Sequence, residues 1–151
     1  MSFQEKNITV SLVNFTLILV YFLIRVLQMA ATETFTQANV FRLWVIIIVA
    51  AVIVTVAATI LTHIVSAIIQ AIITGNKEPD IESRADERDN LIDLRGTKVT
   101  HTVSSLGVLA AMLTFTFGQP PLVMFTLLIF FGILAQVVGD GSRLLLYRRG
   151  F

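Results

Sequence analysis

The sequence predicts an all-α integral membrane protein, a single domain over residues 1–151 that forms a bundle of four transmembrane helices. The composition is the first reason: 56% of the residues are hydrophobic and 14% are charged, whereas soluble domains carry about 25% charged residues. The second reason is that the apolar residues fall into four long runs. A domain of this size cannot bury so much apolar surface in its own core, so a bilayer is the expected solvent.

The first two spans are predicted at residues 8–29 and 41–73. The first run is about 20 residues long, which fits the hydrocarbon core of a bilayer and exceeds the apolar region of a signal peptide. The second run would form a helix of about 50 Å, against a hydrocarbon core of about 30 Å. This helix must tilt, kink or extend beyond the membrane, and we expect it to project into the cytoplasm.

A charged segment, residues 75–98, separates the second and third spans and contains twelve charged side chains. We expect it to be a cytoplasmic loop. Gly75 ends the second helix and Pro79 prevents its continuation. From Asp86 to Thr97 the apolar spacing becomes helical, which predicts a cytoplasmic turn or two of helix that leads into the third span and is capped by Asp86 or Ser83.

The third and fourth spans are predicted at residues 99–117 and 122–146. The connection between them, Gly-Gln-Pro-Pro at 118–121, is short enough that the two helices must form an antiparallel hairpin. Small residues in the fourth span share one helical face and permit the close approach of another helix, either inside the bundle or between chains. They are Gly132, Ala135 and Gly139.

The orientation follows from lysine and arginine near the ends of the spans. One side receives Lys6, the five basic residues of the loop, and Arg143, Arg148 and Arg149. The other side receives only Arg25 and Arg42. The positive-inside rule therefore predicts that both termini are cytoplasmic. Arg25 lies near the outer end of the first span, where it either reaches the head groups or pairs with Glu33 or with an acid of a partner.

Ionisable residues inside spans are costly and are candidates for function. Four of them fall towards the cytoplasmic ends of the spans and form a predicted inner-leaflet polar cluster: His63, His101, Asp140 and Arg143. One reading is a vestibule for an ion, a proton or a lipid head group. The other is local pairing, since Asp140 and Arg143 have the spacing of an i, i+3 ion pair. The histidine and aspartate spacing does not require a metal, and we predict none.

The start of the third helix carries the densest chemistry, Asp86-Glu87-Arg88-Asp89. Paired carboxylates suit acid–base work, but no nucleophile, phosphate loop or metal spacing accompanies them. We therefore predict no enzyme, no cofactor and no nucleic-acid binding. The segment is either a solvated helix start, where acids favour the helix dipole, or a surface for a partner.

Two motifs carry a resemblance to a family. Asp86-Glu87-Arg88-Asp89-x-Leu91-Ile92-x-Leu94 and Leu146-Tyr147-Arg148-Arg149-Gly150, which bound residues 86–150, resemble the small prokaryotic membrane proteins of the domain of unknown function twenty-one seventy-eight family. The resemblance implies four helices in a prokaryotic plasma membrane, and it implies no established activity. It marks six candidate partner-binding residues: Asp86, Glu87, Arg88, Asp89, Arg148 and Arg149.

The function expected from these patterns is that of a non-enzymatic subunit or regulator of a larger membrane assembly. Its expected partners are membrane lipids and further copies of the chain or other membrane subunits. The alternative is a small oligomeric channel or transporter with a polar inner vestibule. The outer halves of the spans contain few polar residues, which disfavours a simple pore. An enzyme acting on lipid is the third reading.

Overall fold

The computed structural model describes residues 3–74 and 87–149, and these residues form four helices. They are α1 (Phe3–Ala31), α2 (Gln37–Thr74), α3 (Glu87–Thr116) and α4 (Pro121–Arg148). Each helix is long and apolar enough to cross a membrane, by length and composition. The predicted all-α fold, with four helices long and apolar enough to span a membrane, is therefore confirmed, while the side of the membrane on which each end lies stays a prediction.

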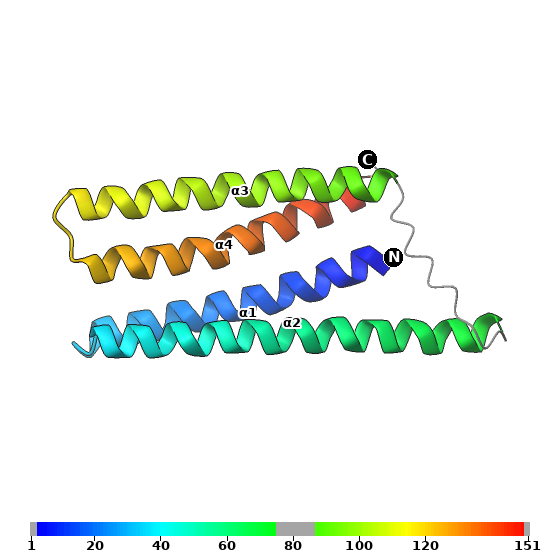
Figure 1. Ribbon diagram of the computed structural model, residues 1–151, viewed down its shortest axis with the longest axis horizontal. Coiled ribbons are helices and arrows are strands. Elements are labelled where there is room, and N and C mark those ends of the chain that lie inside the picture. Colours follow the sequence, from blue (N-terminus) through cyan, green and yellow to red (C-terminus); the bar gives the residue numbers. More distant parts are fainter. Residues whose placement is uncertain (1–2, 75–86, 150–151) are drawn as a thin grey trace.

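The bundle consists of two antiparallel hairpins, α1 with α2 and α3 with α4 (Figure 1). The hairpins are joined mainly by packing of α4 on α1, and α2 makes few contacts with α4. The first turn of α1 and the last turn of α4 lie at the same end of the bundle, as do the last turn of α2 and the first turn of α3. This end is called the open end below, and the end with the two short turns is called the turn end.

An apolar cluster holds the two hairpins together. Its buried members come from three helices: Phe22 of α1, Leu43 and Ile47 of α2, and Ile133 of α4. In a bilayer, burying these side chains yields little hydrophobic free energy, because the lipid tails that they leave are as apolar as leucine. Close van der Waals packing is therefore the main contribution of this cluster.

Helix α2 is the longest element, with 38 residues. At about 1.5 Å per residue it spans roughly 57 Å, far more than the hydrocarbon core of about 30 Å. Figure 1 shows it extending past the first turn of α1 at the open end. From Thr55 to Ile68 every side chain that the structure describes is exposed. The predicted long second helix is confirmed, and the described side chains of its second half lack the close packing that Leu43 and Ile47 have in the first.

The helical turns predicted at the end of the 75–98 segment are confirmed from Glu87 onward, and they are continuous with the third span. Helix α3 begins at Glu87, so residues 87–98 form its first turns, and Glu87 and Asp89 lie in the first one. Acids at a helix N-terminus are favoured by the helix dipole, which explains why so charged a stretch is helical. The predicted caps Ser83 and Asp86, and the predicted breakers Gly75 and Pro79, lie outside the described residues.

Helices α3 and α4 approach each other closely because glycines lie where the two helices meet. A Cβ atom at Gly107 would overlap the side chain of Phe131, and one at Gly139 would overlap Thr100. Gly139 and Ala135 are buried, as expected for a packing face. Gly132 is exposed, with nothing within 4 Å of its Cβ position. Gly132 therefore has no packing role within the chain, and its use between chains stays a prediction.

We expect Gly107→Ala to destabilise the α3–α4 hairpin. The added methyl would meet the Cβ atom of Phe131, which cannot move without its backbone, and such overpacking costs about 1–3 kcal/mol. Gly132→Ala is the matched control, because it adds the same methyl to open space. Thermal unfolding in detergent micelles measures the difference. Equal melting temperatures for the two variants would contradict the packing described here.

Candidate functional site

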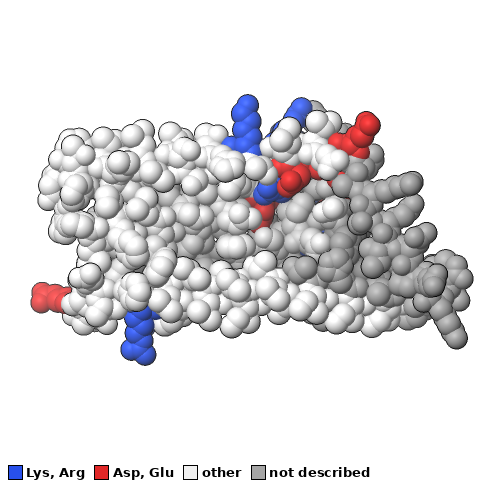
Figure 2. All heavy atoms as spheres, in the orientation of Figure 1, with Lys and Arg blue, Asp and Glu red and all other residues white. Residues whose placement is uncertain are grey.

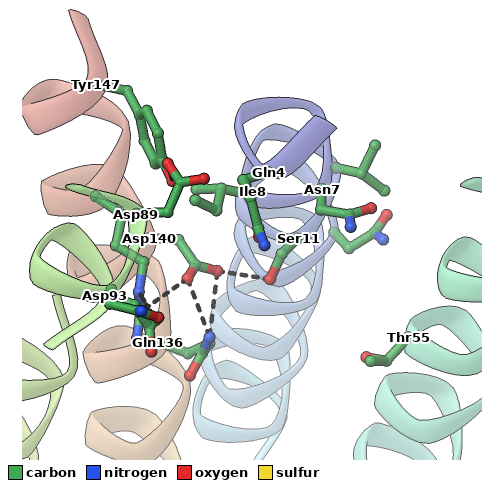
Figure 3. A pocket seen from close by; sticks show the side chains of 14 residues that line it. Gln4, Asn7, Ile8, Ser11, Thr55, Asp89, Asp93, Gln136, Asp140 and Tyr147 are labelled. Atoms are coloured by element: carbon green, nitrogen blue, oxygen red, sulfur yellow. Dashed lines mark hydrogen bonds and ion pairs between the residues drawn. The ribbon is translucent and has the colours of Figure 1, made fainter. Parts of the chain in front are cut away.

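A polar cavity of about 480 Å³ lies between the helices near the open end. Of the fourteen residues that line it, all but Ile8 and Val10 carry a polar group. They come from all four helices, and Figure 3 shows the side chains of α1 and α4 facing one another across the space. Polar groups inside a membrane bundle mark candidate sites, so this cavity is the candidate functional site.

Asp140 of α4 is the most buried charged residue of the site, with 3% exposure. Its carboxylate accepts hydrogen bonds from Ser11 Oγ at 2.6 Å, from Gln136 Nε2 at 3.2 Å to each oxygen, and from Arg143 Nη1 at 3.0 Å (Figure 3). A buried charge is tolerated only when it is paired and hydrogen-bonded. Both oxygens are satisfied here, and the bond to Ser11 fixes α1 against α4.

Arg143 uses all three of its guanidinium nitrogens, and two of them connect α4 to α3. Nη1 bonds to Asp140, Nε donates to Asp93 Oδ1 at 2.9 Å, and Nη2 donates to Thr97 Oγ1 at 2.8 Å. Its side chain lies across Gly96, where any Cβ atom would overlap it. Asp93 is 72% exposed, so the outer ion pair contributes little, whereas the inner pair is screened from water.

A second contact between α3 and α4 lies closer to the open end. Tyr147 donates its hydroxyl proton to Asp89 Oδ1 at 2.7 Å, and Arg88 Nη2 approaches the Tyr147 carbonyl oxygen at 3.5 Å. The two motifs at 86–94 and 146–150 therefore meet in space where the structure describes them. The structure thus joins the chain segments that carry the predicted partner-binding residues.

The predicted partner-binding residues differ in their environment. Asp89 is partly buried by its bond to Tyr147, whereas the other described members are exposed. These exposed members are Glu87, Arg88, Arg148 and Arg149. Asp86 lies outside the described residues. The segment thus combines a structural contact with a charged surface at the open end.

The predicted inner-leaflet cluster is brought together only in part. Asp140 and Arg143 form the expected i, i+3 ion pair at 3.0 Å. His101 is exposed on α3 and does not line the cavity. The side chain of His63 lies outside the described residues. The cavity is therefore organised around Asp140 and Arg143.

Several residues of the site lie outside the predicted four-residue cluster. Asn7, Ser11 and Asn14 line the cavity from one face of α1, and their spacing of four and three residues is a helical signal that indicates a shared face. Gln136 lies one turn before Asp140, which is also readable from the sequence. Asp93 gave no such signal, because its contact with Arg143 depends on how α3 and α4 pack.

The charge of the cavity is negative. Asp89, Asp93 and Asp140 line it together with a single cation of the described residues, Arg143, whose nitrogens are all engaged. Among the described residues, no group of three or more histidine, cysteine, aspartate or glutamate side chains has the geometry to hold a metal ion. The cavity is thus suited to a proton or a polar cation held by oxygen atoms rather than to an anion.

The cavity does not continue along the bundle. Along α1 its lining ends at Asn14, and the apolar cluster with Phe15, Ile18 and Phe22 follows. Along α4 the lining begins at Gln136, immediately beyond the buried Ile133 and Ala135. The described part of the chain therefore forms a vestibule that is closed by apolar side chains.

No family model matches the chain, and neither does any curated protein or solved structure. The resemblance to the domain of unknown function twenty-one seventy-eight family therefore stays a prediction.

We expect Arg143→Gln to destabilise the bundle by about 3–5 kcal/mol, because it leaves the Asp140 carboxylate buried without its counter-charge. Adding Asp140→Asn removes that charge and should recover much of the loss. The control is Arg148→Gln, an exposed position on the same helix that should change stability by no more than about 0.5 kcal/mol. Unfolding free energies in mixed micelles measure these effects. Strictly additive losses in the double variant would refute the pairing.

Proposed function

We propose that the chain is a non-enzymatic, multi-pass membrane protein that acts as a subunit or regulator of a larger assembly. The membrane in this proposal is a prokaryotic plasma membrane, with both termini and the open end in the cytoplasm. One observation carries the proposal: polar side chains are exposed on the outer face of α3, away from α4.

The polar groups on this face are His101 and Ser105, which are separated by one helical turn. Both are exposed, and neither makes a hydrogen bond within the described part of the chain. The neighbouring Thr102 differs, since its hydroxyl donates to the Lys98 carbonyl at 2.9 Å. Acyl chains offer no hydrogen-bond partner to an exposed hydroxyl or imidazole, whereas another helix does. A partner helix on this face would satisfy both groups.

The second half of α2 supports the same proposal. Its described side chains, including Ile60, Ile64 and Ile68, are exposed, with 54%, 51% and 53% of their surface accessible. The first half of the same helix contributes Leu43 and Ile47 to the apolar cluster. The chain therefore presents a long apolar helix that its own bundle covers only in part, in addition to the polar face of α3.

The charged surface at the open end provides the cytoplasmic part of the proposed interface. Arg88, Arg148 and Arg149 are exposed near the contact between Tyr147 and Asp89. Figure 2 shows charged side chains gathered over α3 and α4 towards this end, while the rest of that face is mostly uncharged. Exposed charges at the edge of an interface contribute mainly to orientation and partner choice.

Cysteine crosslinking tests the proposal cleanly because the chain contains no cysteine. We expect Ser105→Cys, carried by the full chain in native membranes, to form a crosslinked species of higher mass with a bifunctional maleimide. The mass distinguishes a second copy of the chain from another subunit. Leu17→Cys on α1 is the control, a lipid-facing position with 63% exposure. A crosslink pattern no different from that of Leu17→Cys, together with a lone monomer in mild detergent, would refute the proposal.

A second candidate function is that of a small oligomeric transporter. The polar cavity favours it, because the cavity opens a hydrophilic space of about 480 Å³ inside the bundle. The apolar cluster that closes the cavity disfavours a static pore. Transport would require the apolar cluster to open on the other side in a second conformation.

Liposome uptake of small cations separates this candidate from the first. If the chain transports a cation through the cavity, Asp140→Asn should reduce uptake at least about tenfold, since it removes the buried charge that the site is built around. His101→Ala should leave uptake unchanged, because His101 does not line the cavity. Uptake that responds to His101→Ala but not to Asp140→Asn would exclude the cavity as the route.

A further inference from the structure

The turn end of the bundle contains a second cavity, of about 660 Å³, between α1 and α2. Two arginines line it, Arg25 from α1 and Arg42 from α2, and no acidic residue that the structure describes does. This cavity lies at the opposite end of the bundle from the candidate functional site. Its charge is also opposite, positive rather than negative.

The two arginines have little compensation from the rest of the chain. Arg25 donates one hydrogen bond, from Nη1 to Gln28 Oε1 at 3.2 Å. Arg42 makes no hydrogen bond or ion pair within the described residues. Glu33, the acid closest to them in the sequence, pairs with neither arginine. The Arg25–Glu33 pair, one of the alternatives for Arg25, is therefore not formed, and most of these guanidinium donors have no partner among the described residues.

The depth of the arginines identifies the region of the bilayer that they reach. Arg25 lies about one and a half turns before the end of α1, and Arg42 lies about as far beyond the start of α2. Helix α1 is roughly 44 Å long, so about 7 Å at each end extends beyond a 30 Å hydrocarbon core. With α1 centred on such a core, both arginines begin close to the hydrocarbon boundary, and their long side chains can extend to the lipid phosphates, where a fixed anion is abundant.

The rest of the cavity lining is divided between polar and apolar groups. Thr32, Thr34 and Asn39 surround the turn, and Thr34 and Asn39 are already joined by a bond from Asn39 Nδ2 to the Thr34 carbonyl at 2.9 Å. On the membrane side, Tyr21 and Ile46 add an apolar wall. A molecule with an anionic head and an apolar tail matches this division, whereas a free ion would leave the apolar wall unused.

From these observations we propose that the cavity between α1 and α2 binds the phosphate of an anionic phospholipid, with Arg25 and Arg42 as its ligands. Arginine presents a planar set of donors that fits two phosphate oxygens at once, and two arginines from different helices would hold one phosphate from two sides. The bound lipid would also neutralise the two positive charges that the positive-inside rule does not favour at this end. The proposal is independent of the partner proposed for α3.

Native mass spectrometry of the full chain in detergent tests the proposal by titration with phosphatidylglycerol. We expect one lipid to bind with preference over phosphatidylcholine. In Arg25→Gln/Arg42→Gln the affinity should fall at least about tenfold, the size expected for losing hydrogen bonds to a charged group. Lys6→Gln/Lys98→Gln is the matched control, because it removes two exposed positive charges from elsewhere in the chain and should leave the affinity unchanged.

The remaining arms separate the possible sources of the anion and guard against misfolding. Inorganic phosphate at millimolar concentration should not displace phosphatidylglycerol; displacement would show a site for free phosphate and overturn the lipid assignment. If the double variant does not fold, Arg42→Gln alone still tests the site, because Arg42 is exposed and bonds to no described residue. Equal lipid affinity in that single variant, or an equal loss in the lysine control, would also overturn the proposal.

Discussion

The buried pair of Asp140 and Arg143 is the interaction on which the open end of the bundle depends. A carboxylate with 3% exposure must be compensated, and its partners come from three directions: Ser11 on α1, Gln136 on α4 and Arg143. Arg143 in turn holds α3 through Asp93 and Thr97. One buried charge thus links three helices, because separating any of them from it would leave a polar group without its partner.

The pair also imposes a requirement on the neighbouring helix. Arg143 can reach Asp93 and Thr97 only by lying across α3, and Gly96 is the residue that leaves room for it. The turn end is held differently, by the packing of Phe22, Leu43 and Ile133. Apolar packing between helices in lipid is less specific than a hydrogen-bonded network, since lipid tails are also apolar. The hydrogen-bonded network at the open end therefore determines most of the register between the helices. The apolar cluster towards the turn end contributes contact area.

The sequence predicts the helices well because hydropathy and length depend only on the chain itself. It also predicts the Asp140–Arg143 pair, whose members are one turn apart on the same helix. It fails where packing decides. The spacing within α4 indicated Gly132, but only the packing of α3 on α4 shows that Gly107 makes the close approach.

Helix α1 contributes to both cavities, which lie at opposite ends of the bundle. It lines the negative cavity through Asn7 and Ser11 at the open end, and the positive cavity through Arg25 at the turn end. It is also the main connection between α2 and the α3–α4 hairpin, because α2 makes few contacts with α4. Helix α1 therefore links α2 to the α3–α4 hairpin, and the bond from Ser11 to Asp140 is the hydrogen bond that joins α1 to the buried charge.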